Sequence, residues 1–388
     1  RTWLVSNLVG RVIINEVLAR NVSAFVHEGE LLDVVELFNP GTTTVDLSGK
    51  GMTDDPAIRY KFVFPANTLL APGQYLLVFA DTEKITSGLH LGFALDQDGD
   101  SLYLYDSVAN GGAFLDNITF GLQIEDLSIG RHPDGLWFLT YPTLGAANSP
   151  HPFADISNLK INEWLAVATV GDDFVEVLNP NSLPVNIGGS CFTGVPVSAP
   201  TLHKIPALSF LPANSYFAFI ADGDAELGVN HLSFRLSPDQ GEIALFSPDV
   251  ALIDSVLYGP QSTDVSEGRT PNGSDTRAFF NLPTPGAPNP AVNVTVIVSN
   301  AVATLFGVTT QPWRFESSGT DLGTTWRQTN YDDSGWPTGF ALFGFETSPG
   351  NYPFPFNTFI ATPPNGGPIT AYFRTHFQWT NGAGWQLF

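Results

Sequence analysis

The sequence predicts an all-β protein with two copies of one folding unit and a third, different β unit. Apolar runs of strand length alternate with turn residues, helical periodicity is nearly absent, and a set of motifs occurs twice in the same order. The 388 residues include 37 Gly and 30 Pro. Because Gly permits positive φ and Pro restricts φ to a narrow negative range, this composition favours many short strands joined by tight turns.

The repeated motifs divide the chain. They are Ile14-Asn15-Glu16 and Ile161-Asn162-Glu163, Val35-Glu36-Leu37 and Val175-Glu176-Val177, and Pro142–Asn148 and Pro283–Asn289. In sequence numbering, the offset between the copies is 147 for Asn15 and Asn162, 140 for Glu36 and Glu176, and 141 for Asn148 and Asn289. Such a near-constant offset indicates two copies that differ in loop length. We therefore expect domains at residues 1–150, 151–290 and 291–388.

Individual strands follow from apolar alternation. The clearest are residues 33–38 and 101–105 in the first copy and 174–178 and 242–246 in the second. Turn residues such as Asn39-Pro40-Gly41 separate them. Strands at a spacing of roughly 8–12 residues with such turns are typical of sandwiches and barrels.

Each copy resembles the lamin-tail domain, an immunoglobulin-like β-sandwich. The resemblance rests on the motifs above together with a Gly-Arg-x-Pro-x-Gly segment at Gly130–Gly135 and Gly268–Gly273, all in one order. It covers residues 11–149 and 158–289, and it is closest to the domains of secreted bacterial proteins. It implies two immunoglobulin-like β-sandwiches in tandem.

The third unit resembles the first half of a galactose-binding-like jelly roll. The resemblance rests on Tyr331-Asp332-Asp333-Ser334-Gly335-Trp336 and on Tyr372-Phe373-Arg374. Because a jelly roll has about eight strands, we expect this unit to be incomplete and the chain to be a fragment of a larger secreted or surface protein.

Charge excludes two classes of partner. The chain has 16 Lys plus Arg against 38 Asp plus Glu, a formal net charge of −22. Nucleic-acid binding needs a cationic stripe, and an anionic membrane surface repels an acidic protein. No apolar run approaches the roughly 18 residues of a transmembrane helix. The expected partners are other protein modules or identical subunits, and a polysaccharide is an alternative.

Two carboxylates in apolar strands predict structural ion pairs. Glu36 and Glu176 lie within such strands, where a carboxylate is unfavourable unless it is paired. Each copy also keeps one arginine, Arg131 or Arg269, in its Gly-Arg motif. We predict the pairs Glu36–Arg131 and Glu176–Arg269; a pair of catalytic acids is the alternative.

Two acidic segments are candidates for Ca²⁺, the one cofactor that the sequence suggests. Asp96, Asp98 and Asp100 alternate as Ca²⁺ ligands do. The second copy keeps a single carboxylate in the matching segment 237–241, so a plain hairpin turn explains both. Asp332 and Asp333 offer a similar choice between Ca²⁺ and a solvated turn.

Aromatic residues of the third unit are candidates for carbohydrate binding, because Trp and Tyr faces stack on sugar rings. The candidates are Trp313, Trp326, Tyr331 and Trp336, with core packing as the alternative. His90 and His231 recur at the offset that relates Asn148 to Asn289, and we expect them to be hydrogen-bonded histidines at strand ends. Cys191 is expected to be a buried apolar residue.

No catalytic signature is present: the sequence has no His-Glu-x-x-His, phosphate loop or Gly-x-Ser-x-Gly. The first functional hypothesis is therefore a noncatalytic, extracellular or cell-surface array of structural or adhesion modules. One alternative is the accessory carbohydrate- or substrate-binding region of a secreted enzyme. Another is a self-assembling filament or surface-layer subunit, through edge strands or the apolar residues 1–10.

Overall fold

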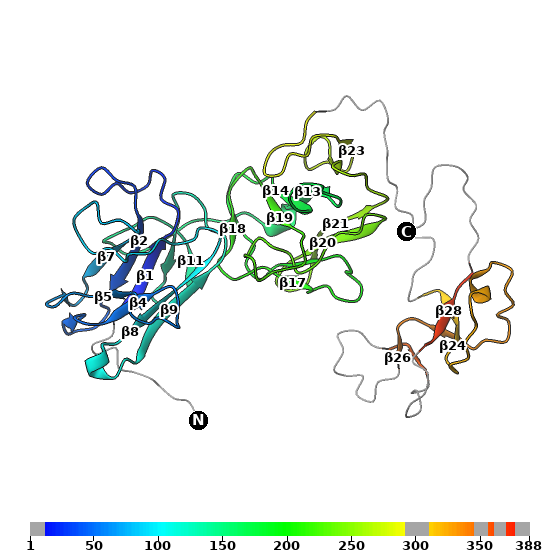
Figure 1. Ribbon diagram of the computed structural model, residues 1–388, viewed down its shortest axis with the longest axis horizontal. Coiled ribbons are helices and arrows are strands. Elements are labelled where there is room, and N and C mark those ends of the chain that lie inside the picture. Colours follow the sequence, from blue (N-terminus) through cyan, green and yellow to red (C-terminus); the bar gives the residue numbers. More distant parts are fainter. Residues whose placement is uncertain (1–11, 292–309, 345–355, 361–369, 377–388) are drawn as a thin grey trace. The chain divides into compact units, whose positions relative to one another are not determined.

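The computed structural model describes residues 12–291, 310–344, 356–360 and 370–376 (Figure 1). Contacts divide the chain into two compact units, one up to Ser299 and one from Asn300. The described parts are built from strands, with single-turn 3-10 helices at η1 (Val108–Asn110), η2 (Ile156–Asn158) and η3 (Thr325–Arg327). The all-β class is confirmed. Among the described residues, no helix has the length and apolarity needed to cross a membrane.

The first unit begins with copy 1, which we define as residues 12–150. Its strands are β1 (Ile13–Leu18), β2 (Asp33–Phe38), β3 (Val45–Asp46), β4 (Gly51–Thr53), β5 (Phe62–Val63), β6 (Leu69–Leu70), β7 (Tyr75–Ala80), β8 (Asp100–Tyr105), β9 (Phe114–Phe120), β10 (Ser128–Arg131), β11 (Trp137–Tyr141) and β12 (Ser149–Pro150). They form a sheet in the order β12-β11-β10-β1-β2-β7, a second sheet β5-β4-β8-β9 and the short pair β3-β6. All these pairings are antiparallel.

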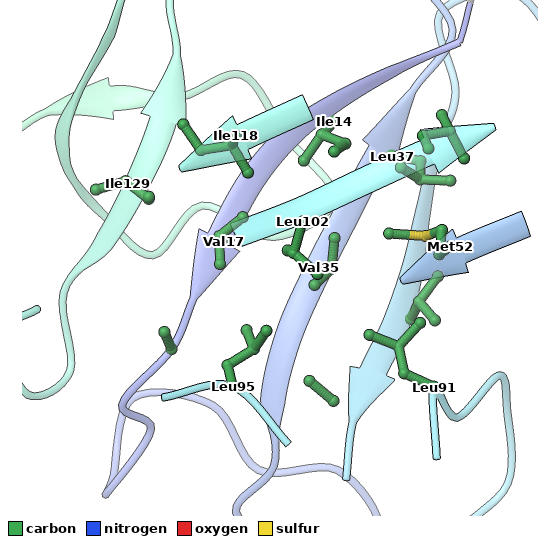
Figure 2. Close-up of a cluster of buried hydrophobic side chains, with 14 of the residues drawn as sticks. Ile14, Val17, Val35, Leu37, Met52, Leu91, Leu95, Leu102, Ile118 and Ile129 are labelled. Carbon is green, nitrogen blue, oxygen red and sulfur yellow. The ribbon is translucent and has the colours of Figure 1, made fainter. Parts of the chain in front are cut away.

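The core of copy 1 lies between its two larger sheets. Val17 and Val35 come from the first sheet and Met52 and Leu102 from the second, and all four side chains are fully buried. Figure 2 shows these side chains converging from strands of both sheets. Removal of this apolar area from water is the main stabilising contribution, at about 25 cal/mol per Å². The arrangement is an immunoglobulin-like β-sandwich.

Copy 2, residues 151–291, repeats this plan. Its strands are β13 (Lys160–Leu165), β14 (Phe174–Asn179), β15 (Val185–Asn186), β16 (Cys191–Thr193), β17 (His203–Lys204), β18 (Phe210–Leu211), β19 (Ser215–Ile220), β20 (Gly241–Phe246), β21 (Leu252–Tyr258), β22 (Ser266–Arg269) and β23 (Arg277–Phe280). The sheets β19-β14-β13-β22-β23 and β17-β16-β20-β21 and the pair β15-β18 match those of copy 1 strand for strand. β12 has no counterpart among the described residues of copy 2.

The second unit is smaller. Its strands are β24 (Pro312–Glu316), β25 (Thr338–Phe340), β26 (Phe343–Gly344), β27 (Thr358–Phe359) and β28 (Tyr372–Arg374). β25-β24-β28 form an antiparallel sheet and β26-β27 a parallel pair. Phe343 packs against Phe315 and Phe373, with ring centroids 5.3 and 4.9 Å apart. The residues that the structure describes here do not amount to a jelly roll, and that prediction stays untested.

Candidate functional site

The recurring motif residues meet at one place in copy 1, around two buried glutamates. Glu16 on β1 lies opposite Glu36 on β2, at a register shift after Ile14, and neither side chain is exposed to solvent. Glu36 accepts hydrogen bonds from Asn15 Nδ2 at 2.8 Å and from the Gly145 amide. Neutral donors therefore satisfy this carboxylate.

The closing motif, Pro142–Asn148, is anchored by these glutamates. Thr143 donates to Glu16 through its amide at 2.9 Å and its hydroxyl at 3.0 Å. Asn148 Nδ2 donates to the carbonyl of Asn15 at 3.0 Å and to that of Arg131 at 2.8 Å. The glycine of the Gly-Arg motif admits Asn148, because a Cβ at Gly130 would lie 2.7 Å from Asn148 Cγ. The motif is thus fastened across β1, β2 and β10.

Copy 2 builds the same arrangement with its own residues. Glu176 accepts from Asn162 Nδ2 at 2.9 Å and from the Gly286 amide at 2.8 Å. The Thr284 hydroxyl donates to Glu163 at 3.0 Å, and Asn289 Nδ2 donates to the Asn162 carbonyl at 3.1 Å. The shared motifs therefore preserve one internal anchor twice, which we call the glutamate anchor: Glu16, Glu36 and Pro142–Asn148 in copy 1, and Glu163, Glu176 and Pro283–Asn289 in copy 2.

Burial controls the ionisation of these carboxyls. Desolvation raises the pKa of Glu36 to about 7 and that of Glu176 to about 8, although hydrogen bonds from Asn15 and Gly145, or from Asn162 and Gly286, oppose the rise. The charge of the neighbouring glutamate in the same copy also raises each pKa. Within the described part of the chain no cationic side chain pairs with either group, so these carboxyls stay protonated more readily than exposed ones.

The predicted pairs Glu36–Arg131 and Glu176–Arg269 are wrong. Arg131 Nη2 lies 2.7 Å from Asp116 Oδ2, and its Nε donates to the Ile14 carbonyl. Glu36 and Arg131 both belong to the β2-β1-β10 part of one sheet, but the guanidinium reaches to β9 of the opposite sheet. Its charge therefore links the two sheets at Asp116.

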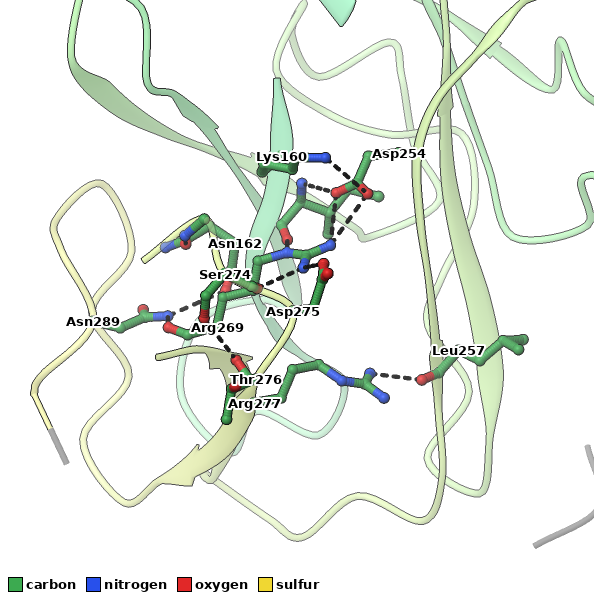
Figure 3. Close-up of polar contacts among 12 residues, drawn as sticks. Lys160, Asn162, Asp254, Leu257, Arg269, Ser274, Asp275, Thr276, Arg277 and Asn289 are labelled. Carbon is green, nitrogen blue, oxygen red and sulfur yellow. Dashed lines mark hydrogen bonds and ion pairs between the residues drawn. The ribbon is translucent and has the colours of Figure 1, made fainter. Parts of the chain in front are cut away.

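Copy 2 repeats this correction. Arg269 Nη2 lies 2.9 Å from Asp254 Oδ2, and its Nε donates to the Ile161 carbonyl at 2.7 Å. Figure 3 shows the guanidinium of Arg269 between Asp254, Ser274 and Asp275. The arginine side chain is 5% exposed and that of Asp254 10%, so this ion pair is largely shielded from solvent.

The correct partner had left a signal in the sequence. Asp116 and Arg131 are 15 residues apart, and so are Asp254 and Arg269. The separation of Glu36 from Arg131, in contrast, differs from that of Glu176 from Arg269. Residues that keep one separation in both copies belong to a stretch without insertions, as β9–β10 and β21–β22 do. The equal sequence separation in both copies therefore favours the Asp–Arg pairs, and the unequal separation disfavours the Glu–Arg pairs.

An acidic depression of about 570 Å³ opens on copy 1. Its lining residues are Ala19, Arg20, Asn21, Asp33, Asp54, Ala94, Leu95, Asp96, Gln97 and Asp100. Burial raises the pKa of Asp33 to about 6. Asp33 accepts from the Asn21 amide at 2.9 Å, and Asp54 lies 2.6 Å from Lys61 Nζ. These carboxylates already have partners within the chain.

The predicted Ca²⁺ segment at this depression has the contacts of a hairpin turn. The Asp98 amide donates to Asp96 Oδ1 at 2.9 Å, and Asp100 accepts from the amides of Ser101 at 2.7 Å and Asp96 at 3.2 Å. In the described parts of the chain, no three His, Cys, Asp or Glu side chains are grouped to hold a metal ion. The geometry favours the turn interpretation.

The second acidic segment also differs from a Ca²⁺ site. Asp332 is exposed and accepts from the Ser334 amide at 3.0 Å, as in a solvated turn. The prediction for Asp333 is wrong, because this residue is 4% exposed and bound by cationic side chains. Its carboxylate lies 2.7 Å from Arg374 Nε, 3.4 Å from Arg314 Nη1 and 2.8 Å from His376 Nε2.

The four carbohydrate candidates are half-buried side chains of the second unit. Tyr331 and Trp336 pack edge to face, with ring centroids 5.8 Å apart, and Trp326 packs likewise on Tyr372 at 5.1 Å. Trp313 lies on β24. The structure thus places Tyr331 and Trp336 in contact, and one part of each ring packs against protein. Carbohydrate binding by these residues stays a prediction.

The histidine prediction is confirmed. His90 Nδ1 lies 2.8 Å from Asp81 Oδ2, and His231 Nδ1 lies 2.7 Å from Asp222 Oδ2. The aspartate that holds His90 directly follows β7, and the aspartate that holds His231 lies two residues after the end of β19. Cys191 is buried, and burial raises the pKa of its thiol.

Comparison with known proteins supports the fold of copy 1. The sequence model of the family described as Lamin Tail Domain matches residues 6–121. This match supports an immunoglobulin-like domain in that part of the chain. Neither the curated proteins nor the solved structures contain a significant match.

Proposed function

We propose that this chain is a noncatalytic array of structural or adhesion modules that acts outside the cell, in the manner of secreted bacterial proteins with tandem lamin-tail domains. The match of residues 6–121 to the Lamin Tail Domain model is consistent with a noncatalytic structural module in copy 1. The proposal adds a second domain of this kind in copy 2, an adhesive role and a location outside the cell.

The glutamate anchor is the observation that carries the proposal. In each copy, the polar residues that recur in the sequence serve to fasten the closing motif across the sheet. The glutamates are fully buried, and the threonines that bind them, Thr143 and Thr284, are half-buried. Duplicated residues that are used in internal architecture are typical of modules whose task is spacing or display.

Two measurements test this function. Protease treatment of intact host cells should degrade the protein while a cytosolic marker survives; protection equal to that of the marker would contradict the proposed location. The isolated 388-residue chain should be inactive in a panel of hydrolase and transferase assays. Activity that co-purifies with the folded chain would overturn the noncatalytic assignment.

Carbohydrate binding by the second unit is a second candidate function. The observation that favours it is the group Trp326, Tyr331 and Trp336, in which each ring is only half-buried. Arg327 lies over the ring of Trp326, and Arg374 lies over that of Tyr331. Rings of this kind can stack on sugars at small entropic cost. Affinity electrophoresis in gels that contain a polysaccharide should show retardation of the chain.

A pair of variants makes this test specific. Trp336→Ala should abolish the retardation, whereas Trp137→Phe in copy 1, where Arg131 covers the indole at 4.8 Å, should not change it. Equal retardation of wild type and Trp336→Ala would remove this residue from the candidate site.

A further inference from the structure

The two copies are joined by a specific contact. The segment after β9, Gly121–Gln123, meets the segment before and into β18, Pro206–Phe210. The Gly121 amide donates to the Ala207 carbonyl at 3.1 Å, and the Phe210 amide donates to the Leu122 carbonyl at 2.9 Å. Gln123 Nε2 adds a bond to the Leu208 carbonyl at 2.8 Å. Backbone pairing of this kind sets a definite geometry between the two segments.

Each copy also inserts one apolar side chain into the other. Phe210 of copy 2 is 1% exposed and belongs to the core cluster of copy 1. Leu122 of copy 1 is 2% exposed and belongs to the core cluster of copy 2. Gly121 permits the close approach, because a Cβ there would lie 2.0 Å from Ser209 Oγ.

Copy 1 contributes Gly121–Gln123 to the contact, and copy 2 contributes Pro206–Phe210. Each copy also contains a counterpart of the segment that the other copy contributes, and this counterpart takes no part in the contact. In copy 1 the counterpart of Pro206–Phe210 is Pro65–Leu69. The two segments are separated by the same number of residues as Asn148 and Asn289. The two segments have the same local structure. Asn67 and Leu208 both have positive φ, and the Thr68 and Ser209 hydroxyls donate to Pro65 and Pro206 carbonyls, each at 2.8 Å.

The second unused segment lies on copy 2. Gly259-Pro260-Gln261 occupies the place of Gly121–Gln123, at the offset that relates Arg131 to Arg269. Gln261 Nε2 donates to the Gly259 carbonyl at 3.0 Å, as Gln123 Nε2 donates to the Gly121 carbonyl at 2.9 Å. The Leu122 carbonyl accepts a hydrogen bond from the Phe210 amide, and the corresponding acceptor in copy 2 is the Pro260 carbonyl.

Exposure distinguishes the used segments from the unused ones. Leu69 is 62% exposed, whereas its counterpart Phe210 is buried. Pro260 is exposed, whereas its counterpart Leu122 is buried. The first unit thus presents the two halves of its own internal contact to solvent, one on each copy.

We infer that Pro65–Leu69 of one chain binds Gly259–Gln261 of a second chain and repeats the contact that joins the copies. A contact between two different surfaces does not close on itself in a pair, so it adds chains head to tail. Pro260 has no amide hydrogen, so the bond that the Leu122 amide donates to Ser209 Oγ has no equivalent between chains. The second hydrogen of Gln261 Nε2 is donated to Glu267 at 3.0 Å, whereas that of Gln123 binds the Leu208 carbonyl. The contact between chains is therefore weaker than the contact within a chain, and the assembly is reversible.

Charge modulates this association. The chain carries a formal net charge of −22, so identical chains repel one another at low ionic strength. The contact itself is made of backbone groups, apolar side chains and the uncharged polar side chains of Gln123 and Ser209. Added salt screens the repulsion, and assembly should increase with salt concentration.

Sedimentation velocity of the full chain over a wide concentration range tests the inference. Wild type should form a concentration-dependent series of species. Leu69→Asp and Pro260→Asp each remove one half of the contact and should be monomeric alone. Mixed together, they should form a dimer and nothing larger, because each chain retains the half that the other lacks. Val170→Asp, at a side chain 91% exposed and outside both segments, should assemble like wild type.

The outcomes separate this inference from the proposed function. A wild-type chain that stays monomeric at all concentrations and salt levels overturns it, and so does assembly of Leu69→Asp and Pro260→Asp to the wild-type extent. If both variants are monomeric but fail to pair when mixed, head-to-tail complementarity is wrong. Near-ultraviolet circular dichroism confirms that each variant is folded, with Leu69→Gln and Pro260→Ser as milder substitutes. None of these results depends on where in the cell the protein acts.

Discussion

Replacement of Glu36 by Gln should remove the contribution of this group to the pH dependence of the stability of copy 1. Glu36 is fully buried, and its two oxygens accept hydrogen bonds from Asn15 Nδ2 and the Gly145 amide. A Gln side chain has nearly the same shape but carries no proton equilibrium. It offers one acceptor oxygen to two donors, so one donor faces an amide NH₂.

The magnitude follows from the pKa. Burial raises the pKa of Glu36 from 4.5 to about 7, so the folded state holds the proton more tightly than the unfolded state. The stability that this proton provides is fully present below pH 4.5 and is lost as pH rises through 7. Over that window wild type should lose ~3 kcal/mol from this group. The unpaired donor in Glu36→Gln should cost about 1–3 kcal/mol at every pH.

The free energy of unfolding of wild type falls with rising pH, whereas the cost in the variant does not change with pH. The two stability curves should therefore cross. Below pH 4.5 the variant should be less stable than wild type, and above pH 7 the difference should vanish or change sign. Urea unfolding, followed by pulse hydrogen exchange of peptides from β1 and β2, reports on copy 1 alone. Glu176 titrates in copy 2 of both proteins and cancels in the comparison. The exposed Glu30 supplies a matched control, since Glu30→Gln should shift neither curve. Parallel stability curves for wild type and Glu36→Gln would refute the reasoning.

Three further changes address other contacts. Arg131→Met leaves the carboxylate of Asp116 buried without its cation, and should lower the free energy of unfolding of copy 1 by ~3–5 kcal/mol in urea titration; a loss below about 1 kcal/mol, roughly the worth of a surface pair, would contradict its role between the sheets. Gly130→Ala places a methyl group 2.7 Å from Asn148 Cγ, and should destabilise copy 1 by about 1–3 kcal/mol and speed amide exchange in the closing motif; unchanged exchange there would show that the motif is held by other contacts. Asp333→Asn removes the charge that pairs with Arg314 and Arg374 and also contacts His376, and should make the second unit susceptible to limited proteolysis while the first unit stays intact; equal resistance in both proteins would contradict a structural role.

Strand positions were predictable because their information is local. The alternation at residues 33–38 predicts β2 with its observed bounds, and residues 174–178, 101–105 and 242–246 predict β14, β8 and β20 to within one residue at either end. A strand carries its side-chain pattern in its own short sequence, whether one face is buried or, as in β2 and β14, nearly every position is buried. The predicted repeat likewise appears as a repeated order of strands.

The partners of the buried charges were not predictable in the same way. A carboxylate within an apolar strand indicates that something satisfies it, but both an arginine and a set of neutral donors meet that condition. Glu36 is satisfied by an amide of the closing motif, 109 residues away, and Asp333, in the loop before β25, by Arg374 on β28, 41 residues away. The packing of sheets and loops determines such contacts, and a single segment of sequence does not specify that packing.

The differences between the copies are as informative as their likeness. Positions with the same role in both, such as Glu36 and Glu176, lie inside the sandwich and hold the closing motif. Two of the positions that differ belong to surface features of copy 1: Asp100 lines the acidic depression and corresponds to Gly241, and Leu69 is exposed and corresponds to the buried Phe210. A duplicated domain has to preserve its internal anchor twice, because either copy fails without it, whereas a surface is free to acquire a separate use. In this chain the surface of copy 2 around Phe210 packs against copy 1. The surfaces around Leu69 and Pro260, which have no partner segment within the first unit, are therefore the places where binding to another chain should be sought first.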